Sequence, residues 1–377
     1  MRERGASHYF PRTLMSIGQE IKRLIAAGPA RRVWSALNRG GISVFTFHRF
    51  QDPKLGNEGH DLAELERFLR GLHQAGLARL SLREAVNRVM AGEIVPQGAV
   101  VLTVDDGYLD FASVAAPLFA KYGCPVTVFL TTGFVDGQLW QWWDRVEYLL
   151  ERYQGPNWEW NVPGTSLVLD FSDYAARRVS IARLIMTLKE LSTAELLEQI
   201  DALSVRVGVV LPEAPLERYR ALSWQDVERL EGQGVRFAPH TISHPVLSRE
   251  ESDVRAEQEI SLSWRKLCGQ VRYPVPVFCY PNGKRADFGK REVRVLRALG
   301  LDAAVTTIPG YLSPGALKAD ELFALPRFSY PEDAMSALLT ASGFTGARQR
   351  MRNLVLTEPE PESAEELYPL PAVYERP

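Results

Sequence analysis

Cysteine is scarce in this chain of 377 residues. The three cysteines, Cys124, Cys268 and Cys279, each lie in or beside an apolar segment, and no two of them have the close spacing of a metal-binding CxxC pair. This scarcity argues against a disulfide scaffold and against a cysteine-rich zinc site. The pattern therefore predicts free thiols and a reducing compartment.

Long apolar runs and a strong net charge are also missing. The N-terminal segment has no uninterrupted apolar stretch of the kind found in signal peptides, and no segment reaches the length of a membrane span. The formal net charge of −2 gives no overall case for binding nucleic acid. We therefore expect a cytoplasmic protein without a nucleic-acid partner.

Charge is nevertheless unevenly distributed between the two ends. Residues 1–40 carry eight Lys or Arg against two Glu, whereas residues 358–377 carry six Glu against one Arg. Residues 1–40 are expected to be a basic helical extension, either packed on the main domain, which we favour, or lying peripherally on an anionic membrane. Residues 331–377 are expected to be a C-terminal extension with an acidic, proline-rich and disordered tail.

Buried strands and helices alternate through the middle of the chain. Residues 42–47 and 100–104 are apolar or β-branched without polar alternation, which is typical of strands buried on both faces in a parallel sheet. Further strands are expected near 125–132, 235–238, 275–280, 302–307 and 323–330, with helices between them. Residues 140–222 interrupt this alternation and are interpreted as a mainly helical insertion into an α/β domain.

Polar residues stand at the ends of these predicted strands. In parallel barrels the carboxyl-terminal ends of the strands form the rim on which active sites are built. The residues at this position are His48, Asp105, Asp106, Thr131, His240, Tyr280 and Thr306.

The adjacent carboxylates Asp105 and Asp106 repel each other, so a buried site that keeps both ionised needs a cation or strong hydrogen bonds. His240 and His244 lie in a proline-flanked loop that can aim two imidazoles at one ion. With one carboxylate they form a three-ligand set that leaves a position open for water. The alternatives are a helix cap for the carboxylates and two hydrogen-bonded loop histidines. We favour one carboxylate as metal ligand and the other as proton acceptor.

Three motifs resemble those of a known family. TVDDGY at 103–108, HTISHP at 240–245 and FCYPNG at 278–283 resemble, in this order, the first three motifs of the polysaccharide deacetylases, a family of metal-dependent carbohydrate esterases. FHRF at 47–50, WWDRVEYLL at 142–150 and LPRF at 325–328 extend the resemblance over residues 42–330. The resemblance implies a distorted (β/α) barrel of about seven parallel strands over residues 41–330.

The resemblance also implies a chemistry. Asp106, His240 and His244 would bind a divalent metal, usually Zn²⁺, and Asp105 would be the general base. A backbone amide near Tyr280 would hold the oxyanion, and Asn282 would form a turn beside the substrate. The expected activity is hydrolytic removal of acetyl groups from N-acetylated sugars of a polysaccharide, oligosaccharide or lipid-linked glycan. Metal-dependent deacetylation of such a glycan or glycolipid is therefore predicted.

The chain departs from the family pattern at three points. Val104 replaces the usual phenylalanine of the first motif, and the third motif lacks the arginine that steadies the base. No histidine follows His244, although many members use a late histidine as general acid. His48 is the candidate substitute, as proton donor or substrate ligand, the alternative being a hydrogen-bonded residue of the rim.

Tryptophans open the insertion. Trp140, Trp142 and Trp143 are expected to anchor it rather than to stack on sugar rings. Two other functions remain open, namely a catalytically silent glycan-binding or assembly protein and a C–N hydrolase that acts on a small amide. Acetate release from acetylated oligosaccharides would separate a glycan deacetylase from both.

Overall fold

The computed structural model describes residues 41–137, 139–313 and 317–348. Its centre is built from short parallel strands that alternate with helices. The expected basic extension of residues 1–40 and the acidic residues 358–377 lie outside the described residues. The strands of the centre are β1 (Ser43–Phe47), β2 (Val100–Val104), β3 (Val126–Leu130), β6 (Arg236–Pro239), β7 (Val277–Cys279), β8 (Ala303–Val305) and β9 (Phe328–Ser329).

These strands close into a distorted barrel. Five form a sheet in the order β6-β3-β2-β1-β9, and β7 and β8 pair separately. The amide of Val275 donates to the carbonyl of Phe237 at 2.8 Å, which joins the start of β7 to β6. A parallel bridge between Val305 and Leu325 joins β8 to the segment before β9. The barrel of seven parallel strands expected from the sequence is confirmed.

Both faces of the strands are buried, as their unbroken apolar runs predict. Val101, Phe129 and Val305 belong to one apolar cluster to which strands all around the barrel contribute, so this cluster fills the interior. Leu102 and Val104 belong to a second cluster, which the strands share with the surrounding helices. β2 is therefore buried on both of its faces, and Asp105 and Asp106 follow directly at its carboxyl-terminal end.

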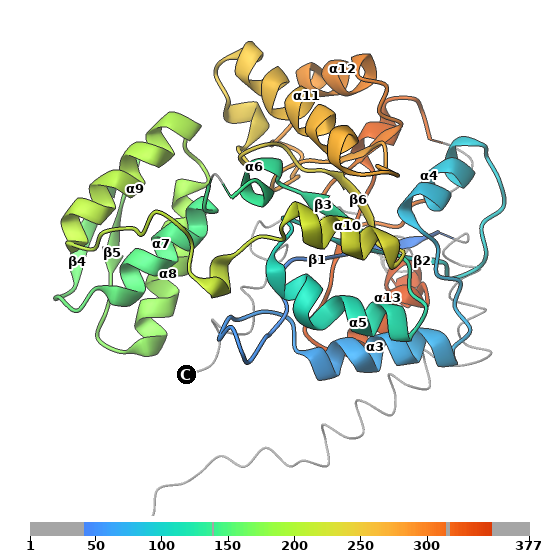
Figure 1. Cartoon of the computed structure of the whole chain (residues 1–377), viewed down its shortest axis with the longest axis horizontal. Helices are drawn as coiled ribbons and strands as arrows, with labels where there is room; N and C mark the ends of the chain where they lie inside the picture. The colour runs from blue at the N-terminus through green and yellow to red at the C-terminus, as the bar shows by residue number, and fades with distance from the viewer. Residues whose placement is uncertain (1–40, 138, 314–316, 349–377) are drawn as a thin grey trace, which may run out of the picture.

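Helices cover the outside of the barrel (Figure 1), with α11 and α12 at the top of the view and α3 and α5 at the bottom. The helix after β2 passes through a π-helical segment, Phe111–Ala115, before α5. The surrounding helices are α3 (Leu62–Gln74), α4 (Leu82–Met90), α5 (Ala116–Lys121), α6 (Thr132–Val135), α10 (Trp224–Gly232), α11 (Asp253–Gln270), α12 (Lys290–Ala298) and α13 (Ala334–Ala341).

The insertion forms a lobe beside the barrel, at the left of Figure 1. It contains α7 (Trp142–Arg152), α8 (Tyr174–Leu188) and α9 (Thr193–Val207), packed around an apolar core of their own. It also contains an antiparallel hairpin of β4 (Trp158–Val162) and β5 (Thr165–Leu169), which the sequence interpretation did not include. The insertion is therefore mainly helical with a small β component.

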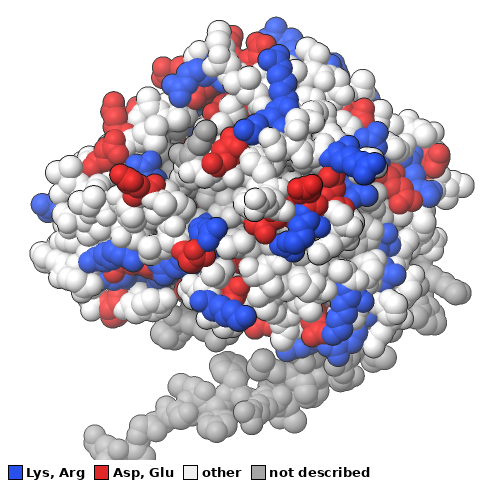
Figure 2. Space-filling model, in the orientation of Figure 1, with Lys and Arg blue, Asp and Glu red and all other residues white. Residues whose placement is uncertain are grey.

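Charges of both signs are interspersed over the visible face of the molecule (Figure 2). This mixture agrees with the small net charge of the chain. Among the described residues, no helix combines the length and the apolar character needed to cross a membrane. All three cysteines are free, as the sequence predicts.

Candidate active site

The first motif turns sharply at the end of β2. The amide of Asp105 donates to the carbonyl of Phe47 at 2.8 Å, so Asp105 still belongs to the sheet. Asp106 has a φ of 72°, in the left-handed region that residues other than glycine rarely adopt. Because of this turn, the two adjacent and buried carboxylates reach different partners.

The second motif forms a loop after β6 that is strained and strongly held. Thr241 and His244 have φ values of 64° and 59°. Glu259 of α11 accepts hydrogen bonds from the amides of Ile242 and Ser243 at 2.8 and 2.9 Å. The carboxylate of Glu259 therefore stabilises the loop in the conformation that aims both histidines at Asp106.

Asp106, His240 and His244 come together as one group whose ligand atoms lie within 4.8 Å of one another. The Nε2 atoms of His240 and His244 are 3.5 and 3.6 Å from Oδ1 of Asp106. That buried oxygen has no hydrogen-bond partner among the described residues. A buried acceptor facing two imidazole nitrogens is typical of a cation site.

The two imidazoles differ in protonation. Nδ1 of His240 is 2.8 Å from the carbonyl of Cys279, so Nδ1 carries a hydrogen and Nε2 points at Asp106. Burial opposes a charge on His240, but Cys279 and Asp106 outweigh it and raise the pKa of this imidazole. Burial, with the neighbouring His240, lowers the pKa of His244 to about 3, which keeps this ring neutral. Two imidazole nitrogens and one carboxylate suit a small divalent ion such as Zn²⁺, which would displace the proton from Nε2 of His240.

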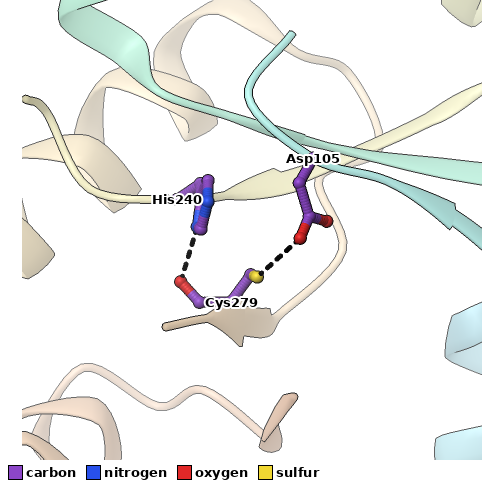
Figure 3. A group of neighbouring side chains, drawn as sticks. All are labelled: Asp105, His240 and Cys279. Carbon is purple, nitrogen blue, oxygen red and sulfur yellow. Dashed lines mark hydrogen bonds between the residues drawn. The ribbon is translucent and has the colours of Figure 1, made fainter. Parts of the chain in front are cut away.

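A second group consists of Asp105, His240 and Cys279, from the ends of three strands (Figure 3). Its polar atoms are already satisfied by protein groups, since Sγ of Cys279 contacts Oδ2 of Asp105 at 3.5 Å and the guanidinium of Arg327 at 3.1 Å. The positive charge of Arg327 opposes a second cation at this place. The group that contains His244 is therefore the better candidate for a metal.

Arg327 is the partner of Asp105 that the sequence did not reveal. Its guanidinium is fully buried and donates to both carboxylate oxygens of Asp105 at 2.8 Å. Burial by itself opposes the ionisation of Asp105, but Arg327 outweighs it and holds the pKa of the carboxyl well below its usual range. Arg327 thus occupies the steadying role for which the third motif has no arginine.

The third motif forms a tight turn at the end of β7. Asn282 has a φ of 58°, and its carbonyl accepts a hydrogen bond from the hydroxyl of Thr307. The ring of Tyr280 stacks on Phe288 at 4.0 Å, and its hydroxyl donates to the carbonyl of Phe323. The phenol of Tyr280 is therefore occupied in the core, and only the backbone of this segment remains for the oxyanion role expected near Tyr280.

His48 lies at the rim beside the proposed base. Its side chain is 50% exposed, and its Nε2 is 3.9 Å from Oδ2 of Asp105. The neighbouring Arg49 is fixed by an ion pair with Asp110, so the rim segment is held in place. His48 can therefore reach both solvent and a substrate bound next to Asp105.

Lys189, which follows α8, acts electrostatically on His244. Its ammonium contributes to the lowering of the pKa of His244. Burial and the neighbouring Lys284 lower the pKa of Lys189 itself. Nothing in the sequence around Lys189 points to this placement, because it depends on how the insertion folds.

Trp140 and Trp143 of the insertion lie in different surroundings. Trp140 packs on Tyr148 and Tyr219 inside the insertion, which agrees with an anchoring role. Trp143 instead contacts the ring of His244, with ring centroids 4.8 Å apart. The insertion therefore reaches the candidate metal centre directly.

Fold and site together define a (β/α)-barrel enzyme whose polar residues converge on the carboxyl-terminal rim. The family model described as "Polysaccharide deacetylase" matches residues 92–167 and 182–304, together more than half of the chain. The chain belongs to the polysaccharide deacetylase family and is a hydrolase that acts on amide bonds. The family expected from the motifs is confirmed.

Solved structures agree with this fold. The Streptococcus pyogenes deacetylase PplD, in complex with acetate, is 18% identical with a TM-score of 0.52, over 80% of this chain and 98% of that one. IcaB from Ammonifex degensii is 16% identical with a TM-score of 0.52, over 81% and 97%. No curated protein matches this chain significantly.

Proposed function

We propose that this chain hydrolyses the acetamide of N-acetylated sugars in a glycan, with a divalent metal held by Asp106, His240 and His244. The substrate is a polysaccharide, an oligosaccharide or a lipid-linked glycan. The unpartnered Oδ1 of Asp106, facing two imidazole nitrogens beside an ionised Asp105, carries the proposal. When bound, Zn²⁺ would lower the pKa of a water and polarise the acetamide carbonyl.

The proton transfers use residues of this chain. Asp105 accepts the proton of the attacking water, and Arg327 keeps this carboxylate ionised and oriented. The amide of Asn282, in the turn that follows Tyr280, holds the oxyanion, because the amides of Tyr280 and Gly283 already donate to Val305 and Pro281 and Pro281 has no N–H. His48 donates a proton to the leaving amine, because it is half exposed and lies close to the base. The products are acetate and a free amino sugar.

The test is acetate release from N-acetylated oligosaccharides by chelator-treated protein with and without added Zn²⁺. Asp105→Asn is expected to bind about one metal ion per chain and to lose about 10²–10⁴-fold in activity. Asp201→Asn is the matched control, because Asp201 is exposed and pairs with Arg145 within the insertion. Absence of both metal uptake and acetate release from any acetylated glycan would overturn the proposal.

Two other results would redirect the assignment. Binding of metal and oligosaccharide without acetate release would identify a silent glycan-binding protein. Release of acetate from small amides alone would identify a C–N hydrolase with another substrate. The buried pair of Arg327 and Asp105 favours catalysis over the silent alternative, because it keeps a carboxylate ionised next to the metal group.

A further inference from the structure

The two histidines of the candidate metal group differ in their support. Histidines that bind metals usually donate the second ring N–H to a carbonyl, carboxylate or water. His240 does so through the carbonyl of Cys279. Nδ1 of His244 is buried and has no hydrogen-bond partner among the described residues. The orientation of His244 must therefore come from packing.

The rings of His240 and Trp143 pack against His244. Their centroids lie 4.7 and 4.8 Å from that of His244, with interplanar angles of 81° and 74°. His240 is itself a proposed ligand, whereas Trp143 contacts His244 from outside the metal group. Trp143 belongs to the first turn of α7 in the insertion.

Trp143 is held by a directed chain of hydrogen bonds. Its Nε1 donates to the hydroxyl of Tyr108 at 2.9 Å, and that hydroxyl donates to Oδ2 of Asp144 at 2.8 Å. The guanidinium of Arg49 lies 3.9 Å from the centre of the Tyr108 ring. Tyr108 and Asp144 are both buried, so neither hydrogen bond is open to exchange with solvent.

The backbone joins the same two regions. The amide of Leu109 donates to the carbonyl of Arg220, and the amide of Leu222 donates to the carbonyl of Gly107, at 2.9 and 2.8 Å. The last residues of the insertion therefore pair with the segment that directly follows Asp106. Both ends of the insertion contact the surroundings of the metal group.

We propose that Trp143, held by Tyr108 and Asp144, is a positioning residue that orients His244 for metal binding, so that the insertion completes the metal centre. This inference rests on the metal site of the proposed function. Loss of this packing leaves the His244 ring free to rotate about its side-chain bonds, and a ligand that must first be ordered binds its ion less tightly.

Co²⁺ binding by the full-length protein tests this inference, because the visible absorption of Co²⁺ reports its coordination without any substrate. Trp143→Phe and Tyr108→Phe are each expected to weaken Co²⁺ binding about 10-fold and to change the spectrum of the bound ion. The double variant should lose little more than either single variant, because both act through one chain of contacts.

Trp160→Phe is the matched control, because Trp160 also lies in the insertion and its Nε1 donates to Gln199 at 3.0 Å, far from the motifs in sequence. Its Co²⁺ affinity and spectrum should stay those of the unmodified protein. Variants are compared only after their unfolding midpoints confirm the native fold. Each Phe replacement removes a hydrogen bond of the chain that fixes the Trp143 ring against His244, while an apolar ring still fills the core. Affinities within twofold and unchanged spectra for Trp143→Phe and Tyr108→Phe would overturn the inference. Failure of the unmodified protein to bind Co²⁺ would overturn the metal site as well.

Discussion

Replacing Arg327 by Met should strongly destabilise the protein at neutral pH. The change removes a fully buried guanidinium that donates to Asp105 twice at 2.8 Å and to the carbonyl of Thr306 at 2.8 Å. Asp105 would then be a buried carboxylate without its cation. Breaking a buried ion pair in this way costs about 3–5 kcal/mol in the free energy of unfolding.

The pH dependence of this loss distinguishes a buried charge from simple loss of packing. In the unmodified protein the pKa of Asp105 is lowered in the folded state, so the stabilisation is complete above pH 3.8 and is lost only as the pH falls further. Without Arg327, burial raises the folded pKa of Asp105 above 3.8. The variant should therefore lose stability as the pH rises from about 4 towards neutral.

Urea unfolding of chelator-treated protein, followed by tryptophan fluorescence between pH 4 and 7, measures both effects. The deficit of Arg327→Met should be largest at pH 7 and shrink towards pH 4. Adding Asp105→Asn to Arg327→Met should recover much of the loss at pH 7, because no charge then remains buried. A deficit near 1 kcal/mol, as for an exposed pair, or one that does not change with pH would refute the reasoning.

Three further outcomes are expected. Zn²⁺ at 1,000 times its Kd should stabilise chelator-treated protein by about 4 kcal/mol in thermal unfolding, and His244→Ala should abolish most of this gain. Gly283→Ala should cost about 1–3 kcal/mol in urea unfolding, because Gly283 has a φ of 70° and a Cβ would lie 2.9 Å from the amide nitrogen of Thr307. His48→Gln should lower kcat/KM about 10²-fold at unchanged metal affinity. The control is His73→Gln on the surface of α3, which should change neither kcat/KM nor metal affinity. Equal kcat/KM values for the two variants would refute a role for His48.

The strand ends were predictable because burial on both faces leaves a clear mark in the sequence. Unbroken apolar runs end at His48 and at Asp105, and the structure places both residues on the rim. Parallel strands must bring their carboxyl-terminal ends to one side, so the meeting of Asp106 with the two loop histidines also follows from the pattern. The group formed by Asp106, His240 and His244 could therefore be expected before the fold was known.

The partner of Asp105 could not be found in the same way. Arg327 lies 222 residues further along the chain, and its guanidinium enters the barrel beside β9, a strand of only two residues. The segment LPRF was recognised as similar to the family, but an arginine next to apolar residues usually points to solvent. Arg327 reaches Asp105 at the end of β2 because β9 pairs in parallel with β1, the neighbour of β2.

The hairpin of the insertion, in contrast, had a local signal. Residues 158–162 alternate apolar and polar side chains before Pro163 and Gly164, residues 165–169 are mostly β-branched or apolar, and Gly164 has a φ of 83°. Strand-forming residues on both sides of a glycine turn are typical of a hairpin. The strongly helical sequence on either side masks this local signal.

The three motifs of the site share a strained backbone. Among the described residues, four other than glycine have positive φ, and all four lie in the three motifs: Asp106, Thr241, His244 and Asn282. Such conformations cost of order 1 kcal/mol or more each, so surrounding contacts must offset them. Glu259 offsets the strain of the histidine loop, and the paired segments Gly107–Leu109 and Arg220–Leu222 brace the turn at Asp106. The last residues of the insertion therefore help to hold the turn that directs the Asp105 and Asp106 carboxylates to different partners.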